Sequence, residues 1–251
     1  MSSKTTKTTV KLVRNRILNA LPPGERRALL RELEMLDLPR QASISRAGEP
    51  MTDVYFPETC MVSVVSTMSN GSCIEAGVIG IRGMAALPVF LDSKEHLLDS
   101  FVQVPGRAGR MSADAFRRSA RPGSALYALG LRYASYFMQQ VARSAACNAL
   151  HRLGQRCARW LLLTADELQR SDYSLTHEYL AEMLGVRRAS VTDVAAELSE
   201  RGLVKYSRGR VRIVDAPALA KAACECYRLV SAEAERMLAG RSAQSTAATH
   251  S

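Results

Sequence analysis

The spacing of hydrophobic positions gives the chain a β-rich first half and a helical second half. From about Gln41 to Val104, short runs rich in β-branched and aromatic residues alternate with turn signals. The runs are DVYF, MVSVVSTM, SCIEAGVIG and SFVQV, and Asn70-Gly71 between two of them is a strong hairpin signal. Strands this short and closely spaced predict a sandwich or roll, closed by a short helix over 113–119.

The residues on either side of these strands follow other patterns. Asn15 to Leu38 reads as helical, with Pro22-Pro23 as an interruption. The Ser/Thr/Lys-rich residues 1–10 and the small, polar residues 240–251 are expected to be disordered. The packed part of the chain therefore lies between these two ends.

A long helix is predicted after Pro122-Gly123, with Ser124 as its N-cap. Its apolar stripe recurs every three or four residues and consists of Leu126, Leu129, Tyr133, Phe137 and Val141. The stripe either packs on the chain's own β domain or forms half of a two-helix dimer interface. The length of the helix favours the dimer. A second helix is predicted over 148–168.

The segment Leu175 to Asp215 has the spacing of a helix-turn-helix followed by a wing. Thr176 can cap a first helix, whose apolar face is Leu180, Met183 and Leu184. Gly185 is free to take the positive φ that ends this helix. The second helix is predicted from about Arg187 to Arg201, with a buried stripe of Val191, Val194 and Leu198.

The wing is predicted as a β-hairpin in which two short strands flank Ser207-Arg208-Gly209. Five basic residues and no acidic one lie between Arg201 and Arg212, which favours contact with a phosphate backbone. The second helix should enter the major groove with its N-terminal residues. The candidate DNA-binding residues are Thr176, Arg187, Arg188, Ala189, Ser190, Thr192, Asp193, Lys205, Ser207, Arg208 and Arg210.

Composition agrees with this interpretation. The 251 residues carry a net charge of +10, which favours a polyanionic partner such as DNA or RNA. With the helix-turn-helix pattern, the expected partner is double-stranded DNA. The sequence has no apolar run long enough for a membrane helix and no secretory core, so a cytoplasmic protein without a membrane partner is expected.

The six cysteines are scattered, with no C-x-x-C pair, so we expect ordinary reduced thiols and no metal site or cofactor. Cys224 and Cys226 lie in a helical pattern over 216–238, where residues two apart do not face each other.

Enzyme motifs are also missing. His177-Glu178 begins like a zinc-protease motif, but the second histidine is replaced by Ala181. The glycines at 77, 80 and 83 have the wrong spacing for a dinucleotide fingerprint and are better explained by a turn of the roll. We therefore expect a protein that is not an enzyme.

The segment LTHEYLAEMLGVRRASVTDVAAELSERGLV and the wing YSRGRVRIV resemble the Crp/Fnr family of bacterial regulators. AGEPMTDVYFPETCMVSVVSTMSNG is similar to the first half of that family's cyclic-nucleotide-type roll. The resemblance implies a homodimer that binds a near-palindromic operator and recruits or blocks RNA polymerase. It covers nearly the whole chain and is most specific in the C-terminal third.

Several residues depart from the family pattern. The family's Arg-Glu-(Thr/Ser)-Val-x-Arg is here Arg188 to Asp193, with Ala189 in place of Glu and Asp193 in place of the last Arg. The base sequence that is read should therefore differ.

The residues of the cyclic-nucleotide pocket also depart from the family pattern. Met84-Ala85 stands near the expected Gly-Glu, and the later phosphate-binding Arg is missing from HLLDSFVQV, so tight cyclic-nucleotide binding is not expected. Arg82 could contact another anion, but it is interpreted as a surface residue. Residues 1–59 contain no cysteine, which excludes the iron–sulfur mode of the Fnr branch. His96 and Cys73 alone are weak indications of haem. The small-molecule effector is unknown.

The expected fold class is α+β: an N-terminal double-stranded β-helix (jelly-roll, cyclic-nucleotide-binding-like) domain, a long dimerisation helix and a C-terminal winged helix-turn-helix. The expected boundaries are 14–122 for the roll, 123–147 for the dimerisation helix, 148–215 for the DNA-binding domain and 216–239 for a final helix. The expected function is sequence-specific transcription regulation. The alternative is a ligand- or protein-binding sensor or adaptor whose helix-turn-helix serves only for packing.

Overall fold

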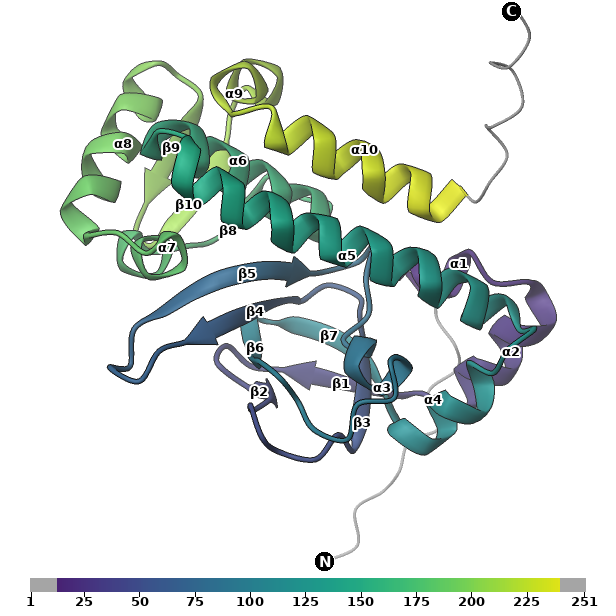
Figure 1. The fold of residues 1–251 in the computed structure, drawn as a ribbon. Coiled ribbons are helices and arrows are strands. Elements are labelled where there is room, and N and C mark those ends of the chain that lie inside the picture. The colour runs from purple at the N-terminus through teal and green to yellow at the C-terminus, as the bar shows by residue number, and fades with distance from the viewer. Residues whose placement is uncertain (1–12, 240–251) are drawn as a thin grey trace, which may run out of the picture.

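The computed structural model describes residues 13–239 (Figure 1). The predictions for residues 1–10 and 240–251 lie outside this range. None of the helices within it is both long and apolar enough to cross a membrane.

Two sheets form an N-terminal roll. One has the strand order β1-β7-β3 and the other the order β2-β6-β4-β5, and every pairing in them is antiparallel. The strands are β1 (Glu34–Leu38), β2 (Ser43–Ser45), β3 (Asp53–Pro57), β4 (Met61–Thr67), β5 (Cys73–Ile79), β6 (Asp99–Val104) and β7 (Gly106–Ser112). The predicted hairpin at Asn70-Gly71 joins β4 to β5, and Gly71 has the positive φ that such a turn needs.

Short helices surround the roll. They are α1 (Arg16–Asn19), α2 (Pro23–Glu32), α3 (Leu87–Phe90) and α4 (Ala113–Ser119). The prediction of helix up to Leu38 is wrong, because residues 34–38 form β1 and pair with β7. Local periodicity gave no sign of that long-range pairing, since strand formation here is decided by a partner about 70 residues away.

The long helix α5 (Ala125–Leu150) follows, capped by the Ser124 hydroxyl, which accepts from the Tyr127 N–H. In Figure 1 it crosses the molecule with the roll on one side and α10 on the other. The predicted stripe faces the chain's own core: Leu126, Leu129 and Tyr133 are buried and Phe137 packs against them. This stripe is therefore not a dimer surface, and the first of the two alternatives holds.

The C-terminal part, as far as residue 239, contains five helices and a three-stranded sheet of order β8-β10-β9. The helices are α6 (Leu153–Leu168), α7 (His177–Leu184), α8 (Arg188–Glu200), α9 (Ala216–Ala222) and α10 (Cys226–Ala239); the strands are β8 (Asp172–Ser174), β9 (Val204–Ser207) and β10 (Arg210–Ile213). The final helix predicted as one piece is two helices, broken at residues 223–225.

One hydrophobic core joins the C-terminal part to the roll. Tyr179 and Leu180 of α7 share it with Met61 and Val78 of the roll strands. Arg82 links the two parts further, because its Nε donates to Glu167 Oε1 at 2.9 Å. Arg82 is only 3% exposed, so its interpretation as a surface residue is wrong.

Gly80 is needed for this link. A Cβ on Gly80 would lie 2.4 Å from the Cβ of Glu167, a distance that two carbon atoms cannot keep. The glycines at 77, 80 and 83 thus belong to close contacts of the roll with α5 and α6.

Candidate nucleic-acid interface

Helix α7 begins and ends as its sequence requires. The Thr176 hydroxyl accepts from the Tyr179 N–H at 3.2 Å, and Gly185 takes a φ of 63° at the end. Because Val186 is the only residue between this glycine and Arg187, the N-cap of α8, the two helices follow one another in a tight turn. Val191 and Leu198 of α8 are buried against the domain core, as predicted.

The first two turns of α8 present polar side chains to solvent. Arg187, Arg188, Ala189, Thr192 and Asp193 are exposed, and Ser190 is half-buried. Neither Arg187 nor Arg188 has an ion-pair partner within residues 13–239. Their charges are therefore available to an external anion.

Thr192 differs from its neighbours. Its hydroxyl donates to the Arg188 carbonyl oxygen at 3.1 Å and lies 3.1 Å from His177 Nδ1. Burial and the charge of Arg188 lower the pKa of His177, which favours the neutral ring. The Thr192 hydroxyl is thus occupied inside the domain, and it is less free for an outside contact than the sequence suggested.

The wing is a hairpin with two left-handed residues at its tip, Arg208 at φ 45° and Gly209 at φ 73°. Positive φ at both central positions is the geometry of the type I′ turn that suits twisted strands. Strand β8 pairs with β10 on its other side, so the residues just before α7 also belong to this sheet. The Gly209 carbonyl accepts from the Leu175 N–H at 2.8 Å, which fixes the wing beside the start of α7.

The basic wing residues fall into two groups. Lys205 and Arg208 are exposed and form no ion pair within the described part of the chain. Arg210 forms an ion pair with Asp172 on β8, and Arg212 lies 4.0 Å from the same carboxylate. Asp172, which the sequence analysis did not weigh, therefore lowers the free positive charge of the wing.

A hollow of about 370 Å³ brings the two halves of the predicted site together. Thr176, Arg188, Ser207 and Arg208 line it, although they lie up to 32 positions apart in sequence. His177 and Tyr206 also line it, with ring centroids 4.8 Å apart in an edge-to-face arrangement. These two aromatic residues were not among those predicted for the site. Their positions in the sequence were the available signal, because His177 follows the Thr176 cap and Tyr206 precedes the predicted turn at Ser207.

A second set of polar side chains meets at the far end of α5. Cys147, His151, Cys224 and Cys226 place their Sγ and ring nitrogen atoms within 4.8 Å of one another. The premise that Cys224 and Cys226 share a helix is wrong, because Cys224 lies in the break before α10. The expectation of scattered thiols therefore does not hold for these three cysteines.

Residues 155–222 match the model of the Crp-like helix-turn-helix domain. The chain is 23% identical to the CRP-like cAMP-activated global transcriptional regulator of Mycobacterium tuberculosis, over 84% of this chain and 98% of that one. Among solved structures it is similar to a CRP-family transcriptional regulator from Thermus thermophilus, with a TM-score of 0.60 at 23% identity, covering 77% of this chain and 99% of the other.

The c-di-GMP responsive global regulator CLP of Xanthomonas campestris is a further similar structure, with a TM-score of 0.60 at 17% identity. That alignment covers 77% of this chain and all of CLP. These likenesses show a cyclic-nucleotide-binding-like domain, a long helix and a helix-turn-helix in the order predicted from the sequence.

Proposed function

The chain belongs to the Crp/Fnr family of DNA-binding transcription regulators, and we propose that it reads an inverted-repeat operator as a homodimer that needs no cyclic nucleotide. The observation that carries the proposal is the hollow between α8 and the wing, which the exposed Arg188 and Arg208 line together with Thr176. Two free cations on a convex helix and a projecting hairpin suit the groove and the backbone of a duplex.

In this proposal α8 enters the major groove and Arg188 reads a base. Its guanidinium can donate to O6 and N7 of one guanine, or hold a phosphate. Ala189 contributes a methyl group that can contact thymine, and the Asp193 carboxylate can accept from cytosine N4. Arg187 and Ser190 flank these positions and suit phosphate or base-edge contacts.

The wing lies on the phosphate backbone. Lys205, Ser207 and Arg208 offer exposed donors on one hairpin, and Thr176 stands beside them at the start of α7. Arg210 joins them only when its ion pair with Asp172 opens. The wing contacts position the protein without reading sequence.

The dimer surface is a second stripe on α5, which the sequence analysis overlooked. Its exposed residues follow a spacing of three and four and are Ala128, Leu131, Ser135, Met138, Ala142, Ala145 and Ala149. Leu131 is 51% and Met138 68% exposed, which is unusual for such apolar side chains. An alternating spacing of this kind is the seam of a two-stranded coiled coil, and its small residues allow a close approach. The partner is therefore a second copy of α5.

Such a dimer presents two copies of α8. Half-sites about 34 Å apart, one turn of DNA, in inverted order are the expected operator. Bound there, the protein recruits or blocks RNA polymerase according to where the operator lies.

The roll supports the absence of cyclic-nucleotide binding. Met84, which stands near the expected Gly-Glu pair, is fully buried and packs in the core shared with α5. The cavity between β5, α5 and α6 measures about 10 Å³, too small for more than a single water. The similar proteins are named for two different nucleotides, cAMP and c-di-GMP, so the fold alone does not fix an effector.

The test is selection of bound sequences from random duplex DNA at about 150 mM salt, since salt sets the non-specific background. The purified protein is used without ligand and then with cAMP. Recovery of the same inverted repeat in both arms supports the proposal. Recovery only with cAMP overturns the nucleotide-independent part, and salt-sensitive binding without any motif in either arm overturns sequence-specific regulation.

A further inference from the structure

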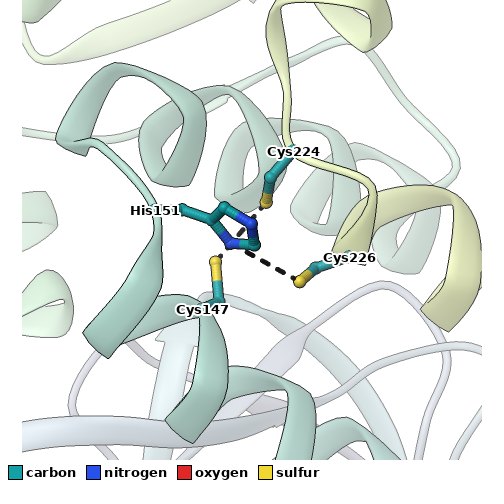
Figure 2. A group of neighbouring side chains, drawn as sticks. All are labelled: Cys147, His151, Cys224 and Cys226. Atoms are coloured by element: carbon teal, nitrogen blue, oxygen red, sulfur yellow. Dashed lines mark hydrogen bonds between the residues drawn. The ribbon is translucent and has the colours of Figure 1, made fainter.

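Four metal-ligand side chains converge where α5 ends (Figure 2). Cys147 lies on the last turn of α5 and His151 is its C-cap, while Cys224 precedes α10 and Cys226 begins it. The two segments are separated by more than 70 residues, so only the fold brings them together. No other group of three or more such residues within residues 13–239 meets this closely.

The distances are those of ligands around one ion. Cys147 Sγ lies 3.5 Å from Cys224 Sγ, and Cys226 Sγ lies 3.7 Å from His151 Nδ1. Ligands about 2.3 Å (sulfur) and 2.0 Å (nitrogen) from a tetrahedral zinc ion lie roughly 3.5–3.8 Å from one another. The four donor atoms, all within 4.8 Å, need to contract only slightly to reach that arrangement.

We propose that Cys147, His151, Cys224 and Cys226 form a Cys3His site for a single tetrahedral zinc ion. Three thiolates and one imidazole are a donor set that zinc takes in closed structural sites. Thiolates that hold an iron–sulfur cluster must surround several atoms, and the short distances here leave room for one.

A carboxylate orients the histidine. His151 Nε2 lies 3.2 Å from Glu225 Oε1, while Nδ1 faces the sulfur of Cys226. A zinc-binding histidine usually donates its other ring N–H to a carboxylate or carbonyl, which fixes the tautomer and raises the basicity of the ligand nitrogen. Nδ1 is therefore the ligand, and Glu225, between the two cysteines in sequence, positions the ring.

The surroundings favour a negatively charged complex. Three thiolates and a divalent ion leave one net negative charge, and the cysteines are nearly free of solvent. Arg156 and Arg159 are both buried nearby, and the Nε of each has no hydrogen-bond partner within the described residues.

The location gives the site a regulatory meaning, which rests on the proposed function. Cys147 and His151 belong to the helix proposed for dimerisation, and α6 of the DNA-binding domain begins only two residues after His151. Cys224 follows α9, which packs against α6. A bound ion therefore fixes the position of the DNA-binding domain relative to α5.

The experiment is metal analysis of the purified full chain, kept reduced and free of chelator, followed by exchange with Co²⁺ as a spectroscopic probe. The expected result is one zinc per chain, and with cobalt the intense visible bands and the thiolate charge-transfer band of a tetrahedral site. Cys226→Ser and His151→Asn should lose the stoichiometric metal and these bands. Cys157→Ala, which removes another buried thiol outside the cluster, should keep both.

Wild-type protein that is folded by circular dichroism and takes up neither zinc nor cobalt overturns the proposal, whatever the variants do. Iron with acid-labile sulfide, or a Cys147–Cys224 disulfide that persists in reductant, overturns it as well. The regulatory step is tested on the selected operator: removal of zinc by a chelator should weaken binding at least tenfold in the wild type. Metal binding without this loss overturns only the regulatory step, and failure to select any operator while zinc is bound overturns only the proposed function.

Discussion

The helix-turn-helix domain has two faces of opposite character. The outward face carries Arg187, Arg188 and Arg208, which are exposed and form no ion pair within the part of the chain described. On the inward face, against the roll, polar side chains pair with groups of the roll: Trp160 Nε1 donates to Glu75 Oε1 at 2.8 Å, and Glu167 pairs with Arg82. Some arginines of this chain are thus exposed and unpaired, whereas others, such as Arg82, are buried and hold the roll and the C-terminal part together.

This division shows that positive charge alone does not mark the interface. The buried arginines Arg82, Arg156 and Arg159 contribute to the net charge of +10, yet an external polyanion cannot reach them. What distinguishes the outward face is exposure without a partner, because a paired or desolvated charge has little left to offer a phosphate.

The largest effect on DNA binding by the outward face should come from separating the two subunits of the proposed dimer. Met138→Glu puts a charge into the exposed stripe of α5 and should convert the dimer to a monomer. Each half-site then binds alone, and operator affinity should fall about 10²–10⁴-fold with the loss of bivalent binding. Light scattering and a binding titration measure both changes. Gln139→Glu, on the same helix but outside the stripe, should stay dimeric; if Met138→Glu also stays dimeric, the stripe is not the interface.

Arg188→Ala should reduce affinity for the selected operator by about 1–3 kcal/mol and relax the preference at one base position. The expectation follows from its exposed guanidinium at the first turn of α8. Competition titrations with operators mutated position by position give the result. Arg201→Ala, at the other end of α8 and paired with Glu197, is the control and should leave the preference unchanged.

Arg208→Asn should weaken binding to all DNA sequences by about the same factor, and this factor should be smaller than the loss caused by Arg188→Ala. The slope of log K against log salt concentration should decrease in magnitude by about one. Asparagine is chosen because it tolerates the positive φ at this position. Arg210→Asn should have a weaker effect, because Asp172 already pairs with that side chain. Equal salt slopes for the two variants would show that the ion pair opens on DNA.

The smallest expected effect is on the inward face, where Glu75 should make the stability of the fold depend on pH. Desolvation raises the pKa of Glu75 to about 7, so the folded state keeps a proton that the unfolded chain loses near pH 4.5. Stability contributed by the protonated carboxyl is therefore full below about pH 4.5 and decreases as the pH rises to about 7. Melting temperatures at pH 5 and pH 7.5 should differ more in the wild type than in Glu75→Gln. The exposed Glu197→Gln serves as the comparison, and a pH dependence unchanged by Glu75→Gln would contradict the assignment.

The sequence predicted those parts of the fold that local signals determine. Thr176 and Gly185 delimit α7 by their own chemistry, as predicted. The wing hairpin is confirmed as well, although Ser207 belongs to β9 and only Arg208 and Gly209 form the tip. Strand β1 was missed because its pairing with β7 depends on a distant segment. Arg82 was misplaced for the same reason, since its partner Glu167 is 85 residues away.

Two further features could be recognised only from the three-dimensional structure. Helix α5 carries two apolar stripes, and periodicity could not say which one the roll covers; only burial separates Leu129 from Leu131. The Cys147 cluster has no sequence motif because its ligands come from two helix ends that are far apart along the chain. The individual DNA contacts proposed for residues such as Asp193 stay predictions until a complex is examined.

The short connection between α5 and α6 also determines how far a small change can reach. Only His151 and Arg152 separate the two helices, and α6 has 16 residues, so it is about 24 Å long. A rotation of roughly 10° at those two residues would move its far end by about 4 Å, by the geometry of a rigid rod of that length. A movement of that size equals more than one base-pair step along the groove. In the proposed dimer, a small rotation at the joint between α5 and α6 would therefore change whether the two copies of α8 match the pitch of the DNA double helix.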